Sequence, residues 1–283
     1  FFVVVLSGFI FRSLRLTRKQ KQIIEERNKD ITDSINYAKR IQEAILPDQK
    51  VIESFFSEAF VLFKPKDVVS GDFYWFAEKN GNKIVAAADC TGHGVPGAFM
   101  SMIGNAFLNQ TVIEKGLTEA DKILSELRFL VINALKQSHA DGGAQDGMDI
   151  ALISINKDNS VLEFSGANNP LWRFRKEKEE WVFTKFDANK RPIGYYMGKG
   201  LPFLSKKIPV QKGDTFYIFS DGFSDQFGGP RKKKYKYKQL EKKLSEIVEH
   251  PLREQKFILE KTFEAWKGSL DQVDDVLVIG FRV

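Results

Sequence analysis

Cysteine and histidine are scarce in this chain of 283 residues, and their scarcity excludes several kinds of catalytic site. The single cysteine, Cys90, rules out an intramolecular disulfide and a cysteine-based zinc site. The histidines are His93, His139 and His250, and the Gly-x-Ser-x-Gly motif of many serine hydrolases is absent. A Ser-His-Asp triad is therefore poorly supported, and hydrolytic chemistry would need a metal ion.

The sequence also lacks an apolar run of the roughly 20 residues that span a bilayer. Residues 1–11 are mostly apolar, and basic side chains follow between Arg12 and Lys21. We expect residues 1–11 to be the C-terminal remnant of a transmembrane segment, because basic residues favour the cytoplasmic side of a membrane. This predicts attachment to the cell inner membrane with a cytoplasmic catalytic domain. The alternative is a buried core segment.

Proline and glycine are absent between Leu16 and Leu46, so no helix breaker lies there. The apolar residues that recur every seven positions are Ile24, Ile31, Ala38 and Ile45. This heptad-like pattern is typical of coiled coils. We expect a signalling helix over residues 12–47, which forms a homodimer through residues 16–46. The alternative is a single amphipathic helix packed on the domain.

Residues 48–283 show the strand and helix patterns of one catalytic domain. The expected strands are Glu58–Lys64, Phe73–Glu78, Lys83–Ala88, Asp149–Ile155, Ser160–Ser165, Leu171–Arg175, Trp181–Phe186, Thr215–Ser220 and Val276–Arg282. The expected helices are Gly97–Glu114, Glu119–Ser138, Tyr237–Glu249 and Leu252–Trp266. Because helices are inserted in pairs between hairpin-linked strands, the pattern favours an α+β fold with antiparallel sheets and helices outside.

The net charge of +6 and the dense basic run Arg231–Lys238 raise the question of a nucleic-acid partner. One such run does not make a binding surface. It follows Gly228-Gly229-Pro230 and precedes an amphipathic helical pattern, so we expect a solvated loop and helix start. The alternative is a site for a polyanion. We expect no nucleic-acid partner.

Acidic residues end or precede four of the apolar strand patterns. They are Asp72, Asp89, Asp221 and the pair Asp274-Asp275. A carboxylate at the end of a buried strand is costly to desolvate, so several that converge are most simply explained by a bound hard cation. Each corner alone is a weak signal, because Ser-Asp-Gly and Asp-Asp occur in many turns. Together they predict a metalloenzyme.

The glycine-rich stretch Gly92–Gly97 matches the dinucleotide-binding pattern G-x-G-x-x-G. Asp89 lies between the preceding strand and the glycines, where a pyrophosphate would need amide donors and no negative charge. The same carboxylate suits a divalent cation. A cysteine phosphatase needs a phosphate-cradling loop with an arginine six positions after the cysteine. The residue six positions after Cys90 is Pro96. We therefore expect the backbone carbonyl of Cys90 to matter more than its sulfur.

With these motifs in this order, the chain resembles the bacterial serine phosphatases of the stage II sporulation protein E type, within the metal-dependent protein phosphatase 2C superfamily. The matching stretches are Ser70–Trp75, Ala88–Ala98, Gly166–Leu171, Phe219–Gly222 and Asp274–Val276. Two departures stand out. Asn168-Asn169 replaces a Gly-His of many relatives, and the phosphate-binding arginine of the eukaryotic branch has no clear counterpart, with Lys64 and Lys66 as stand-ins.

The resemblance implies a four-layer αββα sandwich of two antiparallel sheets with flanking helices, preceded by the long coiled-coil-like helix. It also implies two divalent cations, Mn²⁺ or Mg²⁺, that activate a water to hydrolyse phosphoserine or phosphothreonine. The implied metal ligands are Asp72, Asp89, the Cys90 carbonyl, Asp221, Asp274 and Asp275. Asp89, Asp221 and Asp274 are the implied catalytic residues, and Asp274 is favoured over Asp275 as ligand.

The substrate implied is a phosphorylated protein, for example an anti-sigma-factor antagonist, in bacterial signal transduction. Two alternatives from other classes remain open at this point. A nucleotide cyclase can also follow a coiled linker and use two metals, although we identify no purine-selecting motif. A catalytically inactive signalling module would need a missing ligand, and all four acidic corners are present.

Overall fold

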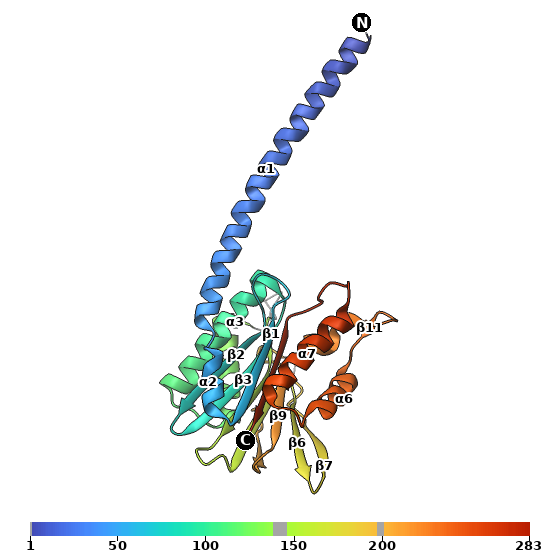
Figure 1. Cartoon of the computed structure of the whole chain (residues 1–283). Helices are drawn as coiled ribbons and strands as arrows, with labels where there is room; N and C mark the ends of the chain where they lie inside the picture. Colours follow the sequence, from blue (N-terminus) through green and yellow to red (C-terminus); the bar gives the residue numbers. More distant parts are fainter. Residues whose placement is uncertain (1, 138–145, 197–200) are drawn as a thin grey trace. The chain divides into compact units, whose positions relative to one another are not determined.

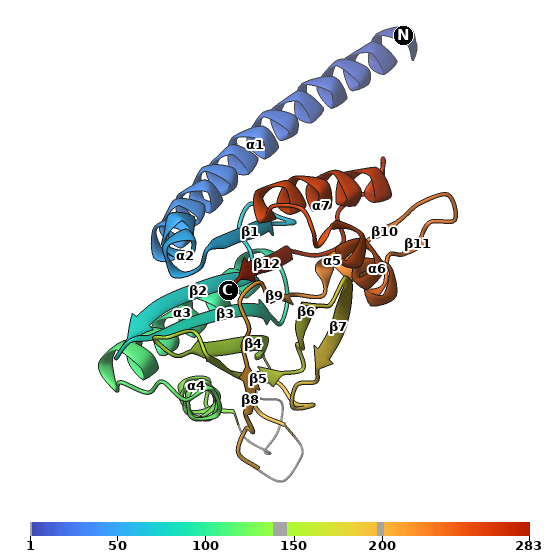
Figure 2. The ribbon, with the colours of Figure 1, turned by 60° about the horizontal axis from the view of Figure 1, so that its bottom comes forward.

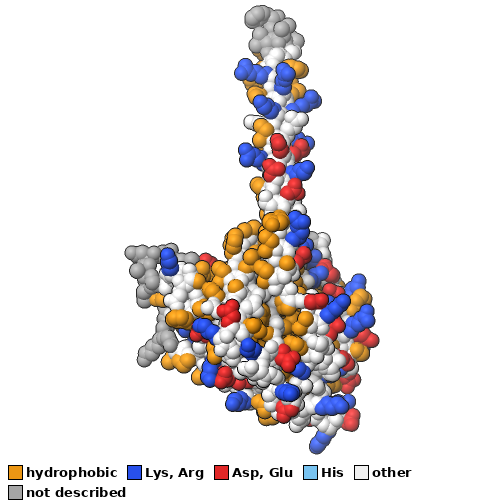
Figure 3. Space-filling model, turned by 90° about the vertical axis from the view of Figure 1, so that its left-hand side faces the viewer, with side chains coloured by type: hydrophobic (Ala, Val, Ile, Leu, Met, Phe, Trp, Pro, Cys, Tyr) orange, Lys and Arg blue, Asp and Glu red, His pale blue; other side chains and the backbone are white. Residues whose placement is uncertain are grey.

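The computed structural model describes residues 2–137, 146–196 and 201–283, which fall into two compact units, Phe1–Glu43 and Ala44–Val283. Helix α1 (Phe2–Ile45) begins earlier than the predicted helix and continues through Gly8. Most of its described side chains are exposed, and Lys, Arg, Asp and Glu are spread along it (Figure 3). In the described part of the chain, no helix is both long and apolar enough to span a membrane.

The second unit is built on two five-stranded antiparallel sheets (Figures 1 and 2). The first has the order β1 (Glu58–Lys64), β12 (Val276–Arg282), β9 (Thr215–Phe219), β6 (Leu171–Glu177), β7 (Glu180–Phe186). The second has the order β2 (Phe73–Lys79), β3 (Asn82–Cys90), β4 (Met148–Ile155), β5 (Val161–Ala167), β8 (Lys206–Pro209). All strand pairs within them are antiparallel, as the hairpin-linked pattern predicted.

A helical layer covers the outer face of each sheet. The helices on the β2–β8 sheet are α3 (Gly94–Leu108), the π-helical segment η1 (Asn109–Glu114) and α4 (Ala120–Ala134). Those on the β1–β7 sheet are α5 (Gly222–Asp225), α6 (Tyr237–Ile247) and α7 (Leu252–Lys267), and α2 (Gln49–Phe55) packs beside β1. The predicted four-layer αββα sandwich is therefore confirmed.

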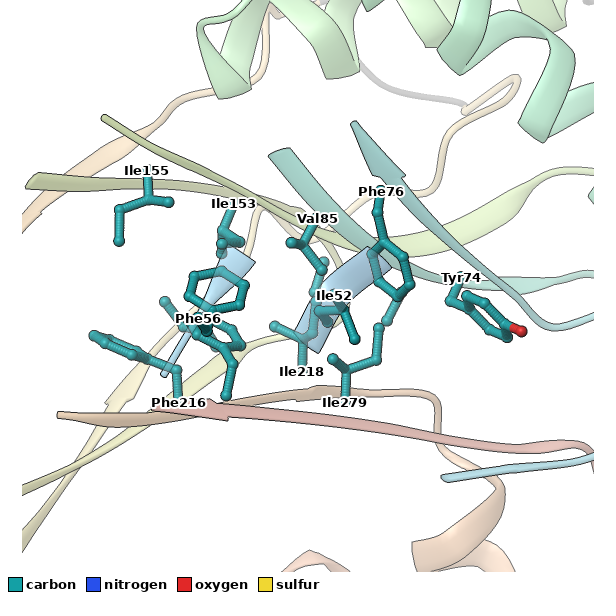
Figure 4. Packing of buried hydrophobic residues seen from close by; sticks show 14 of the residues in the cluster. Ile52, Phe56, Tyr74, Phe76, Val85, Ile153, Ile155, Phe216, Ile218 and Ile279 are labelled. Atoms are coloured by element: carbon teal, nitrogen blue, oxygen red, sulfur yellow. The ribbon is translucent and has the colours of Figure 1, made fainter. Parts of the chain in front are cut away.

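The apolar layer between the two sheets is made by alternate residues of the strands, because successive side chains of a strand point to opposite faces. Val85 of β3, Ile153 of β4, Ile218 of β9 and Ile279 of β12 point into this layer together with Phe76 (Figure 4). Ile84, Ala86 and Ala88 point the other way, toward α3 and α4. This parity decides which strand-end residues face the space between the sheets.

The differences from the predicted elements are local. The expected helix over 97–114 begins at Gly94 and changes to η1 at Asn109. The next helix ends at Ala134, before its expected end at Ser138, which lies outside the described residues. Helix α2, strand β8 and the short hairpin β10 (Phe227–Gly228) and β11 (Lys233–Lys234) were not predicted. They are short elements whose apolar residues are too few to show a period.

Candidate active site

Antiparallel pairing brings the acidic corners to one end of the sandwich. Asp221 follows β9 after Ser220, and Asp274 lies just before its partner strand β12. In the other sheet, Asp89 lies near the end of β3, and Asp72 precedes β2, whose first residue pairs with Ala88. Because β3 contacts both β9 and β12 across the sandwich, the two sets of carboxylates meet there.

Strand parity places Asp89 on the side that faces the other sheet. Asp89 continues the series Val85 and Ala87, which belongs to the layer between the sheets. Its Oδ2 lies 3.4 Å from the backbone nitrogen of Asp221, which donates a long hydrogen bond across the sandwich. Of the predicted site residues, Asp89 and Asp221 are thus joined directly.

Asp275 is buried, and its carboxylate fixes the loop that carries Asp72. Its Oδ1 accepts a hydrogen bond from the backbone N–H of Lys66 at 2.7 Å, and its Oδ2 accepts one from Gly71 at 2.7 Å. Asp274 is half-buried, and its Oδ1 accepts the backbone N–H of Asp275 at 2.9 Å. Asp275 is therefore committed to backbone amides, which favours Asp274 as the carboxylate available to a ligand.

The structure adds Asp149, which the sequence reasoning missed as a site residue. Asp149 lies opposite Asp89 in the β3–β4 pairing, so both carboxylates come from one end of the same strand pair. Its Oδ1 accepts a hydrogen bond from the side-chain amide of Asn168 at 2.8 Å. Asn168 thus orients an acidic residue of the cluster. The parity of Asp149 with Ala151 and Ile153 was a signal that could have found it.

Asp72 is the most deeply buried of the clustered carboxylates that could bind a ligand. Its Oδ2 is shielded from solvent, and no described residue donates a hydrogen bond to it. An unsatisfied buried carboxylate oxygen costs folding free energy. A bound cation would give this oxygen the partner that the protein does not supply.

Burial raises the pKa of Asp72, Asp89, Asp149, Asp221 and Asp274, and repulsion by neighbouring carboxylates raises it further for all of them except Asp149. The pKa of Asp72 lies well above its usual range because of burial and then the Asp89 charge. That of Asp89 is raised by burial, Asp221 and Asp274. Burial, then Asp225 and Asp274, raise the pKa of Asp221 to about 6. Burial also raises the pKa of Asp149 and Asp274.

Cys90 is buried, and its side chain belongs to the apolar cluster under α3. Burial, followed by the charges of Asp72 and Asp89, raises the pKa of the thiol well above its usual range. A buried neutral thiol is not a nucleophile. The cysteine-nucleophile alternative is therefore unsupported.

The glycine-rich turn after Cys90 serves close packing. A Cβ on Gly97 would overlap the carbonyl oxygen of Gly92 and lie 2.8 Å from the Cα of Gly71. The start of α3 can therefore approach the Asp72 loop only without a side chain at this position. This packing explains the glycine at position 97 without a pyrophosphate.

The two lysines named as phosphate-binding stand-ins, Lys64 and Lys66, differ in their ion pairs. The Nζ atom of Lys64 is paired with Glu264 at 2.8 Å. Lys66 has no ion pair among the described residues, and its charge opposes the rise in the pKa of Asp274. His93 Nδ1 is hydrogen-bonded to Asp67 Oδ2 at 2.6 Å, and both side chains are half-exposed. Of the two stand-ins, Lys66 is therefore the one whose unpaired charge acts on a carboxylate of the cluster.

The carboxylates suit hard divalent cations, which take oxygen ligands. Within the described residues, no group of three or more His, Cys, Asp or Glu side chains is placed so that it could hold a metal ion. Mg²⁺ usually keeps several waters and takes one or two carboxylates, so three protein side chains are not required. The buried free oxygen of Asp72 and the mutually repelling charges are the observations that fit a cation.

We predict that Asp72→Asn raises the thermal stability of the metal-free protein at pH 7.5. The pKa of Asp72 is raised above 3.8, so its charge penalises the folded state as pH rises above about 4, and the amide removes this penalty. Relief of about 1–2 kcal/mol would raise the Tm by roughly 2–8 °C. The gain should shrink toward pH 4. Asp33→Asn on exposed α1 is the matched control and should change little; an equal shift in both variants would contradict the interpretation.

Comparison with known proteins gives consistent results. The sequence model of the family "Stage II sporulation protein E (SpoIIE)" matches residues 79–283. The solved SiaA-PP2C domain of Pseudomonas aeruginosa is similar, with 30% identity, a TM-score of 0.79, and coverage of 90% of this chain and 98% of that one. No curated protein sequence matches the chain.

Two more distant solved structures share the fold. The first contains the PP2C phosphatase domain and a regulatory fragment of SpoIIE from Bacillus subtilis. Its identity is 18% and its TM-score 0.63, and the match covers 80% of this chain and 62% of that one. The second contains the RsbU and RsbW domains of Rv1364c from Mycobacterium tuberculosis, with 14% identity, a TM-score of 0.59, and coverage of 79% and 59%.

Proposed function

The chain belongs to the stage II sporulation protein E family of metal-dependent serine/threonine phosphatases, and from this premise we propose that it uses two divalent cations, Mn²⁺ or Mg²⁺. The observation that carries the proposal is the meeting of carboxylates from both sheets around the unsatisfied Oδ2 of Asp72. Nucleotide cyclase activity has no comparable support.

In this proposal Asp89 would be a ligand of both cations, because it is central to the cluster and lies next to Asp221. Asp221 and Asp274 would hold one cation, Asp72 would hold the other, and the Cys90 carbonyl would contribute an oxygen. Asp275 acts through the Lys66 and Gly71 amides, so its place is that of a positioning residue. Bound divalent ions would lower the pKa of a coordinated water and neutralise phosphoryl oxygens.

The residues at the rim complete the proposed chemistry. Lys66 contributes a positive charge beside Asp274, where the phosphate of a substrate approaches. The hydrogen bond between Nδ1 of His93 and the Asp67 carboxylate leaves Nε2 for another partner. We propose that Asp67 fixes the orientation of the His93 ring so that His93 can transfer a proton to the departing serine or threonine oxygen.

Removal of the divalent cations tests the proposed function. With the full chain, p-nitrophenyl phosphate hydrolysis should fall to background in excess EDTA and return when Mn²⁺ exceeds the chelator, because the carboxylates alone offer phosphate only repulsion. The measurement is the rate of p-nitrophenol release at 405 nm. Undiminished hydrolysis in EDTA would contradict the proposal.

We also propose that the substrate is a phosphorylated regulatory protein of bacterial signalling, such as an anti-sigma-factor antagonist. Support comes from the family and from the shared fold with a protein that joins RsbU and RsbW domains. Release of inorganic phosphate from a phosphoserine form of such an antagonist, compared with a phosphotyrosine peptide, tests this assignment.

The proposals of a homodimer and of membrane attachment concern residues 1–46. The exposed Ile24 and Ile31 on α1 are available for pairing with a second copy. A monomer in sedimentation equilibrium would contradict the dimer, and Ile24→Asp with Ile31→Asp should dissociate it.

The apolar residues before Arg12 support a membrane contact, which fractionation of cells expressing the full chain or residues 12–283 would test.

A further inference from the structure

A basic hairpin projects from the sandwich beside the end that carries the carboxylates. It is formed by β10 and β11, and Figure 2 shows it reaching beyond α6 and α7. We call residues 229–236 the basic arm. Its basic side chains are exposed, and they are Arg231, Lys232, Lys233, Lys234 and Lys236. Within the described chain, Lys234 has an ion pair and the other four have none.

The basic arm is fixed to the helix that follows Asp221. The backbone N–H of Lys236 donates to the carbonyl of Ser224 at 2.6 Å, and Lys234 Nζ contacts Asp225 Oδ2 at 2.6 Å. The N–H of Asp225 in turn donates to the carbonyl of Asp221 at 2.9 Å. Two successive polar contacts therefore connect the arm with the backbone of Asp221, a residue of the candidate active site.

Trp266 at the end of α7 supports the base of the arm. Its carbonyl accepts a hydrogen bond from Gly229 at 2.8 Å, and its indole Nε1 donates to the carbonyl of Gln226 at 3.0 Å. Its ring meets that of the buried Tyr235 edge-on, with centroids 5.2 Å apart. The arm is thus a braced structure rather than a loose loop.

A cavity of about 490 Å³ lies along the arm and has a cationic lining. Its lining residues include Arg231, Lys233, Lys234, Lys236 and Trp266, and no described acidic residue lines it. Lys234 is paired with Asp225, but Arg231, Lys233 and Lys236 have no ion pair among the described residues. Their charges repel one another, and an anionic ligand relieves this repulsion. The cavity is suited to a chain of carboxylates or phosphates.

We propose that the basic arm binds an acidic segment of the protein substrate, next to the phosphorylated residue. This inference rests on the proposed function, because it assigns a role to the arm in that same reaction. A cationic surface beside Asp221 attracts an acidic segment and orients the substrate. The specificity would then be for phosphoserine or phosphothreonine flanked by glutamate or aspartate.

Two phosphoserine peptides of equal length test the arm, one with three glutamates beside the phosphoserine and one with glutamines there. The wild-type full chain should hydrolyse the acidic peptide with a kcat/KM roughly ten-fold higher at low salt, since three exposed ion pairs are involved. The preference should decrease as salt screens the charges. A variant with Arg231→Ala, Lys233→Ala and Lys236→Gly should lose the preference and keep p-nitrophenyl phosphate hydrolysis. Glycine replaces Lys236 because the backbone φ of Lys236 is +71°, which glycine adopts without strain.

A variant with Lys157→Ala, Lys207→Ala and Lys212→Ala is the matched control, because it removes three exposed positive charges that do not line the cavity. It should keep the preference for the acidic peptide. Equal kcat/KM for both peptides in the wild type, or a preference that survives in the arm variant, would overturn the inference without affecting the proposed function. Loss of all p-nitrophenyl phosphate hydrolysis in the wild type would instead contradict the proposed function.

Fluorescence anisotropy with the two peptides tests the arm independently of turnover. The wild type should bind the acidic peptide roughly ten-fold more tightly than the glutamine peptide, and the arm variant should bind both equally. A single-stranded oligonucleotide of matched charge serves as competitor. Tighter binding of the oligonucleotide than of the acidic peptide, lost in the arm variant, would overturn the proposal in favour of a nucleic-acid site.

Discussion

Asp89→Asn should lower kcat/KM for a phosphoserine peptide by roughly 10³-fold. Changes to residues that only support a metal ligand cost roughly 10- to 100-fold, and Asp89 is the proposed ligand of both cations. Asparagine has nearly the same size and can accept the Asp221 N–H, so the packing at the end of β3 is retained. What is lost is the negative charge.

The same substitution should raise the Tm of the metal-free protein, because burial and neighbouring aspartates raise the pKa of Asp89 and make its charge unfavourable at neutral pH. Activity and stability should therefore change in opposite directions, as expected where a functional site is maintained at a cost to folding. Steady-state kinetics in Mn²⁺ and thermal unfolding in EDTA measure the two effects. Asp33→Asn should alter neither, and an active Asp89→Asn enzyme would refute the role of Asp89.

Gly222→Ala should reduce both stability and activity, although alanine is the better helix former by about 0.5–1 kcal/mol. Gly222 begins α5 directly after Asp221, and a Cβ there would overlap the carbonyl oxygen of Asp275. Overpacking costs about 1–3 kcal/mol, which outweighs the gain in helix propensity. The strain would separate Asp221 from Asp274, and a displacement of about 1 Å can cost 10²-fold in rate.

Gly8→Ala provides the comparison for Gly222→Ala, because Gly8 is also helical and a Cβ there meets no atom within 4 Å. It should leave kcat/KM unchanged and keep or slightly raise the Tm. The measurements are thermal unfolding and phosphoserine peptide hydrolysis under the same conditions. If Gly222→Ala matched Gly8→Ala in both, the contact between α5 and the start of β12 would not be what positions the two carboxylates.

The strands of the sandwich could be predicted because their apolar runs are bounded by turn residues, and β1 and β12 occur where they were expected. The acidic corners could be recognised because each interrupts or ends such a run. By contrast, β8 has two lysines and a proline in four residues, so its sequence carries little strand signal. The change from α3 to η1 at Asn109 depends on a hydrogen-bond pattern that hydrophobic periodicity does not encode.

Roles that depend on distant pairing could not be derived from local sequence. The Asp275 carboxylate accepts a hydrogen bond from the backbone amide of Lys66, which lies 209 positions away in the sequence. Asp149 has the appearance of an ordinary strand residue until the β3–β4 register places it opposite Asp89. The basic run was predicted to be a solvated loop and helix start, and its lysines and arginine are exposed. Its bracing by Trp266 and its link to Asp225 follow only from the fold.

Titration calorimetry of the metal-free full chain with Mn²⁺ tests the central claim most directly, because it counts the cations and needs no substrate. The account predicts two Mn²⁺ ions per chain for the wild type. Asp89→Asn should weaken both binding events, since Asp89 is proposed to be shared, whereas Asp33→Asn should leave them unchanged. Binding of two ions with unaltered affinity in Asp89→Asn, or no binding by the wild type, would contradict it.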